Sequence, residues 1–291
     1  MLGVYNAEQY IAEQLESILT QTCQDWILYI RDDASTDNTL QIMNEFASKY
    51  ADKIKIVTDN LGNLGCNGNY FHLLQLVNAK YYMFCNADDF WFPFKVEISY
   101  KRMLEIEKEQ GNKPIIVHTD LTITDERLNI LAESYWEKNN VNPEKYKTYN
   151  KIGICSMVAG ATMIFNQKVK DLTFPVLEGA PFFDHWMALQ TVKTGVISTI
   201  HAPTIAYRQI GSNLAAVSIG SDNTLLNKIK NVKKVLNYNK KEVEMLRKIG
   251  WGSYSKYFLF KLIVFSQLRF GKKYTSKGKD EANIHLKKIN K

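Results

Sequence analysis

Two adjacent aspartates, Asp88 and Asp89, follow an apolar run from Tyr81 to Cys85 that we expect to be a buried strand. Neighbouring carboxylates repel each other unless a positive charge neutralises them. A hard divalent cation such as Mg²⁺ or Mn²⁺ takes oxygen ligands and could bridge this pair to a diphosphate. A solvated turn at the end of the strand is the alternative interpretation.

A second pair, Asp32 and Asp33, ends the apolar, β-rich run from Trp26 to Ile30. A carboxylate at the end of a buried strand can accept the imide N–H of uracil or thymine more strongly than a neutral side chain can. The alternative is that both aspartates only cap the following helix, for which residues 35–38 also offer capping side chains.

A third acidic group, Asp184, stands among aromatic residues in the segment 181–186. Loss of water around this carboxylate could raise its pKa into a range that suits a general base. A helix is predicted to begin here, because apolar residues continue at 187, 189 and 192, so Asp184 could instead be an N-cap. We expect His185 to pack or orient, and Trp186 to line a pocket.

Short apolar runs alternate with stretches of helical periodicity in the first part of the chain. We predict helices at 7–20, after 38 and at 70–77, a Gly/Asn-rich loop at 60–69, and strands at 26–30, 54–57 and 81–85. This alternation predicts an α/β, Rossmann-like fold with a mostly parallel sheet flanked by helices on both faces. Ligands bind beyond the carboxyl ends of the strands in such sheets, where both acidic pairs stand.

Several kinds of protein are excluded by missing motifs. No GxGxxG follows a predicted strand and no GxxxxGK[ST] occurs, which argues against a dinucleotide-binding dehydrogenase and a P-loop enzyme.

Residues 2–5 have the character of the end of a strand that is either very short or truncated. No signal-peptide pattern follows Met1, so we expect a cytoplasmic protein. The cysteines lack metal or disulfide spacing and are expected to be reduced core thiols: Cys23, Cys66, Cys85 and Cys155.

The charge of the chain is divided unevenly. Of the 37 Lys and Arg residues, 18 lie in residues 221–291 together with only five acids, whereas the rest of the chain carries an acidic excess of six. Lys228 to Lys248 is expected to be a basic helix, and Tyr257 to Phe270 mixes aromatic, aliphatic and basic residues. This run is too short and interrupted to span a bilayer, but suits a helix on an anionic membrane surface. A terminal helix docked on the body is the alternative.

Five short motifs occur in an order that indicates a family. They are Val4-Tyr5-Asn6, Gln21-Thr22, the segment 32–39, the segment 86–91, and Asp184-His185-Trp186. Together they resemble a family 2 glycosyltransferase with the GT-A fold, and within it the rhamnosyltransferase-like branch. The resemblance covers roughly residues 1–215, which we expect to be the GT-A domain, and leaves 216–291 as a basic helical C-terminal extension.

The resemblance implies a nucleotide site formed by Tyr5, Asn6, Asp32 and Asp33. In it Asp33 would accept a hydrogen bond from the base, and Tyr5 would lie near the base. Arg208 would contact the diphosphate.

The resemblance also implies a cation, Mg²⁺ or Mn²⁺, at Asp88 and Asp89. The chain departs from the family pattern at two places: Asn86 stands where an acid is usual, and Ile210, in the closing segment 207–213, stands where relatives often have histidine. Asn86 could still ligate through its carbonyl oxygen. These departures remove two candidate ligand groups.

The remaining implied roles concern the two substrates. Gly160 would back the donor sugar, although a strand kink explains a glycine there almost as well. Asp184 would take the proton of the acceptor hydroxyl as that oxygen attacks the sugar carbon opposite the diphosphate. His185 and Trp186 would lie at the acceptor pocket.

The family pattern predicts an inverting glycosyltransferase that uses a nucleotide-sugar donor, best matched by dTDP-rhamnose and next by a UDP-sugar. The expected acceptor is a lipid-linked saccharide at the inner face of the cell membrane, in the synthesis of a surface polysaccharide. A non-catalytic nucleotide-sugar-binding relative or partner subunit is the alternative. A nucleic-acid binder could use the basic tail, but it would not need the acidic pairs.

Overall fold

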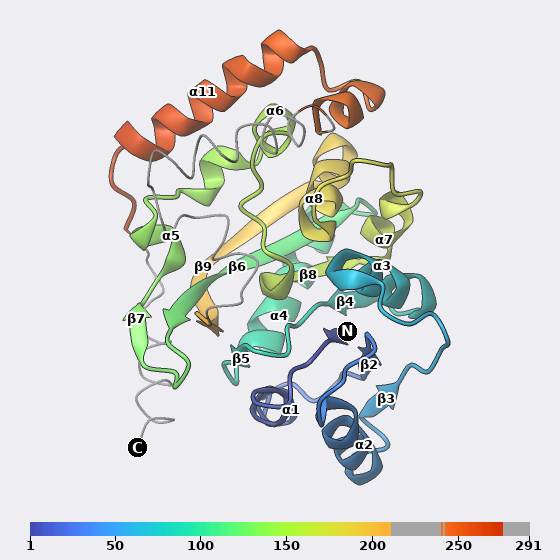
Figure 1. Cartoon of the computed structure of the whole chain (residues 1–291). Coiled ribbons are helices and arrows are strands. Elements are labelled where there is room, and N and C mark those ends of the chain that lie inside the picture. The colour runs from blue at the N-terminus through green and yellow to red at the C-terminus, as the bar shows by residue number, and fades with distance from the viewer. Residues whose placement is uncertain (211–239, 241, 276–291) are drawn as a thin grey trace, which may run out of the picture.

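The computed structural model of this protein describes residues 1–210, 240 and 242–275, and the following account concerns those residues. Two β-sheets form the centre of the molecule and helices surround them (Figure 1). The first sheet is wholly parallel, in the order β1-β2-β3. Its strands are β1 (Leu2–Val4), β2 (Leu28–Asp32) and β3 (Ile54–Ile56).

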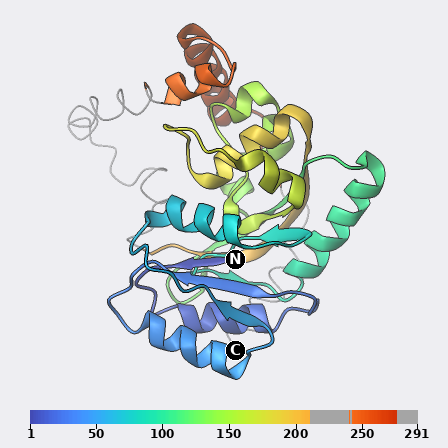
Figure 2. The same ribbon diagram turned by 90° about the vertical axis from the view of Figure 1, so that its right-hand side faces the viewer.

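Three helices cover the first sheet: α1 (Ile11–Leu19), α2 (Thr39–Lys49) and α3 (Gly65–Leu76). Figure 2 shows α3 on one face of the sheet and α1 and α2 on the other. The buried face of α1 carries Ile11, Leu15 and Ile18, as the helical spacing predicts. Val4 lies opposite Asp32 in the register, so the chain leaves β1 and β2 at the same edge of the sheet.

The second sheet is mixed, with the order β4-β8-β6-β9-β5 and β7 paired to β6. Only the β6–β9 pair is parallel. The strands of this second sheet are β4 (Tyr81–Met83), β5 (Phe90–Trp91), β6 (Ile115–Thr124), β7 (Ile130–Ala132), β8 (Met163–Asn166) and β9 (Val196–Arg208).

The expectation of a mostly parallel sheet is therefore confirmed for β1 to β3 and wrong for the second sheet. The turn between β6 and β7 is too short for a crossover, so these strands must run antiparallel. Every residue of β6 is buried, which removes the alternation of apolar and polar residues from its sequence. The sheets meet where Leu2 bridges Cys85 and the Cys85 N–H donates to the Met1 carbonyl over 3.0 Å.

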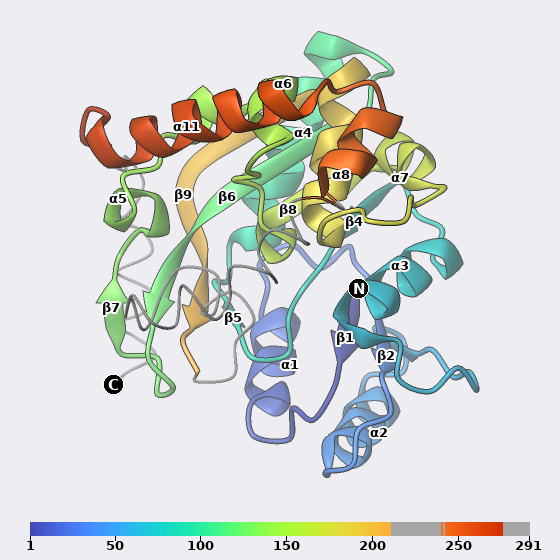
Figure 3. The same ribbon diagram turned by 45° about the horizontal axis from the view of Figure 1, so that its top comes forward.

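The other helices pack around the second sheet. The longest are α4 (Lys95–Gln110), α8 (Phe183–Thr194) and α11 (Tyr254–Phe270), and α11 crosses the outside of the molecule on the side away from α2 (Figures 1 and 3). The shorter ones are α5 (Tyr135–Lys138), η1 (Pro143–Tyr146), α6 (Tyr149–Ile152), η2 (Gly160–Thr162) and α7 (Gln167–Thr173). Among the residues described, no helix combines the length and apolar character needed to cross a membrane.

Element boundaries differ from the predicted ones in places. The largest difference is at α3, which begins at Gly65, inside the segment predicted as a loop. Gly65 has φ +69°, a conformation that glycine adopts without steric cost, and so allows the chain to turn sharply into the helix. Of the predicted helix 228–248, the structure describes a helical part at 242–248, while the rest, residues 211–213 of the closing segment and the boundary at 215 lie outside the described residues.

Candidate active site

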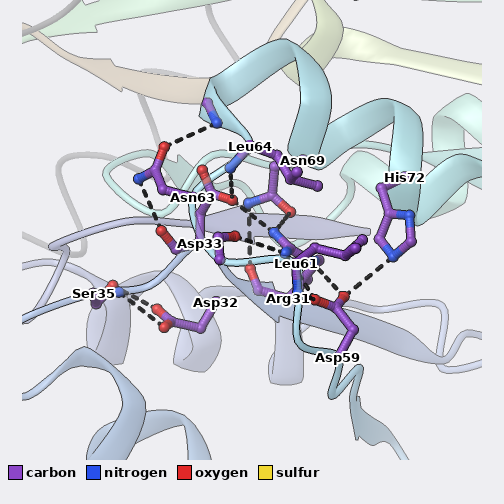
Figure 4. Close-up of polar contacts among 12 residues, drawn as sticks. Arg31, Asp32, Asp33, Ser35, Asp59, Leu61, Asn63, Leu64, Asn69 and His72 are labelled. Carbon is purple, nitrogen blue, oxygen red and sulfur yellow. Dashed lines mark hydrogen bonds and ion pairs between the residues drawn. The ribbon is translucent and has the colours of Figure 1, made fainter.

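Asp33 lies just beyond β2 and is held by two hydrogen bonds to one of its oxygens. Its Oδ1 accepts from Arg31 Nη1 over 2.6 Å and from the Leu64 N–H over 2.8 Å (Figure 4). Its own N–H donates to the Val4 carbonyl over 2.8 Å. Within the described residues, Oδ2 accepts no hydrogen bond. One edge of this carboxylate is therefore fixed and the other is available to a donor.

Arg31 is buried and holds the segment that leads into α3. Its Nε and Nη2 donate to the two oxygens of Asp59 over 2.7 and 3.0 Å, and Nη2 also donates to the Gly62 carbonyl over 2.9 Å. Nη1 reaches Asn69 Oδ1 at 3.2 Å in addition to Asp33. The hydrogen bond from Arg31 holds the pKa of Asp59 well below its usual range.

The loops after β1 and β2 are tied together by polar contacts. The Asn6 N–H donates to Ser35 Oγ over 2.9 Å, and Asn6 Oδ1 accepts from the Thr36 N–H over 2.8 Å. Asp32 accepts from the Ser35 N–H over 3.0 Å and from the Ser35 hydroxyl (Figure 4), so its carboxylate stabilises the turn after β2 and does not cap α2, whose N-cap is Asn38. Tyr5 is exposed beside this loop, where it can contact a ligand.

The first turn of α3 connects the two halves of the site. Asn67 Oδ1 accepts from the Phe183 N–H at the start of α8 over 2.9 Å, three residues after Leu64 contacts Asp33. Surrounding protein atoms raise the pKa of the Cys66 thiol to about 11, and the charges of Asp184, Asp33 and Asp88 add to this rise. All three carboxylates therefore lie within electrostatic range of one side chain. The sequence did not single out this turn; its asparagines and glycines were the only signal.

Asp184 lies in the first turn of α8, whose N-cap is Phe182, so Asp184 is not itself the N-cap. Its Oδ2 accepts from the Gly160 N–H over 2.9 Å and its Oδ1 accepts from the His185 N–H over 2.7 Å. Burial raises its pKa, and these backbone hydrogen bonds act in the opposite direction. A carboxylate with a raised pKa and a fixed orientation suits a general base.

Gly160 is buried against this carboxylate. A Cβ at this position would lie 2.6 Å from Phe183 Cζ, so the glycine permits the close approach of its N–H to Asp184. In this structure Gly160 holds Asp184, and its predicted place behind the donor sugar stays a prediction.

His185 and Trp186 point away from the surface. His185 Nε2 hydrogen-bonds to the Ile152 carbonyl, which fits the expected orienting role, and burial lowers its pKa. Trp186 is 2% exposed and donates from Nε1 to the Thr173 carbonyl over 2.8 Å. The expectation that Trp186 lines a pocket is wrong, because its indole belongs to the core beneath α8.

The Asp88–Asp89 pair differs in exposure: Asp88 is half-buried, whereas Asp89 is fully buried. Asn86 Nδ2 donates to Asp89 Oδ2 over 2.9 Å, and Asn86 Oδ1 accepts from the Tyr70 hydroxyl over 3.1 Å. Asp89 Oδ1 is buried and has no hydrogen-bond partner among the described residues. Burial raises the pKa of Asp88, and burial together with the charge of Asp88 raises that of Asp89 well above its usual range.

This donor set fits a divalent cation in part. Two repelling carboxylates, one with an unpartnered buried oxygen, are groups that a cation would stabilise. Among the residues described, however, no group of three His, Cys, Asp or Glu side chains could hold a metal ion. Asn86 orients Asp89 and Tyr70, so its carbonyl oxygen is already engaged. A divalent cation at this pair would need oxygen ligands besides Asp88 and Asp89.

Arg208, at the end of β9, does not present its side chain to solvent. It is 3% exposed and its guanidinium donates to Glu13, to the Asp88 carbonyl over 3.0 Å and to the Glu126 carbonyl over 2.7 Å. The expectation that Arg208 contacts a diphosphate is therefore not met. Its guanidinium braces the backbone at Asp88 instead.

Comparison with known proteins agrees with this architecture. Residues 2–171 match the model of the family described as glycosyl transferase family 2. The chain is 37% identical to the dTDP-rhamnosyl transferase RfbG of Shigella flexneri over 99 residues, which are 33% of this chain and 34% of that protein. It is 28% identical over 222 residues to the Escherichia coli UDP-Glc:alpha-D-GlcNAc-diphosphoundecaprenol beta-1,3-glucosyltransferase WfgD, covering 73% of this chain and 77% of that protein.

The chain spans less than half of the length of the first curated relatives that it matches. Among solved structures, residues 1–349 of S. aureus TarS in complex with UDP-GlcNAc align with a TM-score of 0.52 at 17% identity, over 91% of this chain and 76% of that chain. At this identity the match shows the shared fold. With a parallel first sheet, a mixed second sheet and a family match over more than half of its length, the chain belongs to glycosyl transferase family 2 and has the GT-A fold.

Proposed function

We propose that this protein is an inverting glycosyltransferase that transfers a sugar from a nucleoside diphosphate to a hydroxyl group of a lipid-linked saccharide. The observation that supports this best is that the start of α3 contacts each of the three segments that carry Asp33, Asp88 and Asp184. The three segments are far apart in the sequence, and α3 holds them near one another.

Each carboxylate has a separate task in the proposed reaction. The free oxygen of Asp33 accepts the imide N–H of the base. Asp184 accepts the proton of the acceptor hydroxyl as its oxygen attacks the sugar carbon, and Gly160 and His185 hold it in place. A Mg²⁺ or Mn²⁺ ion at Asp88 and Asp89 would neutralise the charge of the departing diphosphate.

The donor is proposed to be dTDP-rhamnose, or otherwise a UDP-sugar. RfbG is named as a dTDP-rhamnosyl transferase, WfgD as a UDP-Glc-dependent enzyme, and TarS was solved with UDP-GlcNAc. Thymine and uracil share the imide N–H that Asp33 would recognise. A diphosphoundecaprenol-linked acceptor, as WfgD's name states for that enzyme, supports a lipid-linked acceptor here.

The basic C-terminal part, residues 216–291, is proposed to hold the enzyme at an anionic membrane surface. Within it, α11 packs through Tyr257 and Val264 and leaves an exposed apolar row formed by Phe258, Leu262 and Phe265, which are 51%, 70% and 66% exposed. Residues 250–275 contain five basic residues and no acid. An apolar row with basic neighbours suits the interface of an anionic bilayer.

The catalytic proposal is tested with Asp184→Asn, using the exposed Asp171→Asn on α7 as a matched control. We expect the Asp184 variant to lose transfer by more than about 10²-fold, because an amide cannot accept the proton, while UDP affinity stays within about threefold. Unchanged turnover would refute the role of Asp184. Binding of UDP or dTDP without transfer or hydrolysis across a broad donor and acceptor panel would favour the non-catalytic alternative.

The membrane proposal is tested by sedimentation with phosphatidylglycerol and phosphatidylcholine vesicles. The triple change Phe258→Ser, Leu262→Ser and Phe265→Ser should weaken binding to the anionic vesicles, because it removes the exposed apolar row while keeping the basic residues. The control changes an exposed apolar residue elsewhere, Leu131→Ser. Equal binding by the triple variant and the wild type would contradict the proposal.

A further inference from the structure

Arg31 combines deep burial with an unusually complete set of partners. It is 1% exposed, and its side chain donates hydrogen bonds to four residues around the proposed base site: Asp33, Asp59, Gly62 and Asn69 (Figure 4). A guanidinium fork can hold two carboxylates in fixed directions, which a lysine ammonium cannot reproduce. The same group therefore fixes both the loop before α3 and the orientation of Asp33.

The consequence lies in which oxygen of Asp33 remains free. Oδ1 already accepts two hydrogen bonds, from Arg31 and from the Leu64 N–H. Only 3% of the Asp33 side chain is exposed, so a base can approach it along a single edge. One charged acceptor oxygen facing the site matches a base that offers one N–H donor.

The four bases differ in this respect. Uracil and thymine present a single imide N–H between two carbonyl groups. Guanine presents two neighbouring N–H groups, which pair best with both oxygens of one carboxylate. Cytosine has an acceptor nitrogen at the ring position where uracil and thymine carry the imide N–H, so a carboxylate oxygen placed to accept there would be repelled. A carboxylate whose one oxygen is already hydrogen-bonded within the protein therefore favours uracil and thymine over guanine and cytosine.

We infer that Arg31 is a positioning residue that sets the base preference of the site, by occupying one oxygen of Asp33 and leaving one acceptor for the imide N–H of uracil or thymine. This inference rests on the proposed function, because it takes Asp33 as the group that meets the base. Asp59 supports Arg31 from the opposite side and His72 Nε2 lies 3.1 Å from Asp59 Oδ2, which extends the support into α3.

The test measures affinities of UDP, dTDP, CDP and GDP by titration calorimetry for the wild type, Arg31→Lys and the matched control Arg102→Lys, whose arginine is on the surface of α4 paired with Glu105. The wild type should prefer UDP and dTDP to CDP and GDP by about tenfold or more. Arg31→Lys should lower this preference by about tenfold, because Asp33 loses its fixed orientation. For transfer, the donor KM should rise and kcat should change less than about threefold.

The outcomes separate the possible failures. A folded Arg31→Lys protein that weakens all four nucleotides equally, or none, would overturn the inference, since a purely structural role lowers affinity without changing the preference. If Arg31→Lys does not fold, Asp59→Asn takes its place: it should lower the preference in the same direction, and an unchanged preference would again overturn the inference. If the wild type binds none of the four nucleotides, the proposed function itself fails.

Discussion

The buried carboxylate of Asp89 should make the protein less stable at neutral pH than an isosteric neutral variant. Its Oδ1 is buried without a partner among the described residues, and Asp88 adds a like charge next to it. Replacement by asparagine removes the charge and keeps an atom of similar size at each position. We therefore expect Asp89→Asn to raise the melting temperature at pH 8 in the absence of divalent cations.

The magnitude follows from the charge that the substitution removes, because asparagine keeps an uncharged polar atom at the same place. A buried polar atom without a partner costs about 1–3 kcal/mol and a charged one costs more, so we expect a gain of about 1 kcal/mol or more from removal of the charge. In a protein of this size, each kcal/mol corresponds to a change in melting temperature of about 2–4 °C. Lys95 is also buried, but burial lowers its pKa to about 7, so most of its charge is absent at pH 8 and does little to offset this cost.

The dependence on pH has a definite sign. Burial raises the folded-state pKa of Asp89 above the ordinary value of 3.8, so the folded protein holds this proton more tightly than the unfolded chain does. The stabilisation by this proton is complete below the unfolded pKa and is lost as the pH rises through the folded pKa. The gain in stability from Asp89→Asn should therefore be absent near pH 4 and grow as the pH rises toward 8.

Melting curves from pH 4 to pH 8 measure this gain. Asp171→Asn is the control, because Asp171 is exposed on α7 and its charge lies in water, so its variant should not gain stability. Addition of Mn²⁺ with UDP should raise the melting temperature of the wild type and not that of Asp89→Asn. A lower melting temperature for Asp89→Asn than for the wild type at pH 8 would refute the reasoning.

Two further predictions concern Asp184, the proposed general base, and Gly160, which holds its carboxylate. Gly160→Ala places a Cβ 2.6 Å from the Phe183 ring and should lower stability by about 1–3 kcal/mol and turnover by more than nucleotide affinity; addition of Phe183→Leu should restore both in part, and failure of this rescue would argue against the clash. Because burial raises the pKa of Asp184 and a general base acts deprotonated, kcat should fall on the acid side at a higher pH than for an exposed aspartate. A kcat that stays constant down to pH 4 would exclude this role.

The sequence predicted the parts of the fold that repeat locally. The alternation of apolar runs and helical stretches located β2, β3, β4 and α1 to within a few residues, because each buries one face or one short run against the sheet. The second sheet could not be predicted in the same way. Its strand directions depend on connections and on pairings between distant segments, such as β6 with β9.

The candidate site shows the same division. The acidic motifs identified Asp33, Asp88 and Asp184, whose positions follow strand ends and a helix start. The sequence could not reveal which side chains face inward. Trp186 and Arg208 are residue types that often line binding sites, but here both donate their hydrogen bonds to backbone carbonyls inside the protein. Hydrogen bonding in three dimensions, and not residue type, decides availability.

The short turn between Leu64 and Asn67 has a consequence for substrate binding. It touches the carboxylate proposed to hold the base at one end and the first residue of the helix that carries Asp184 at the other. If binding of a substrate shifts one of these two contacts, the other contact must adjust as well, because only three residues of chain separate them. We expect donor and acceptor binding to be coupled, so that each substrate changes the affinity for the other by the same factor, which titrations of one in the presence and absence of the other would reveal.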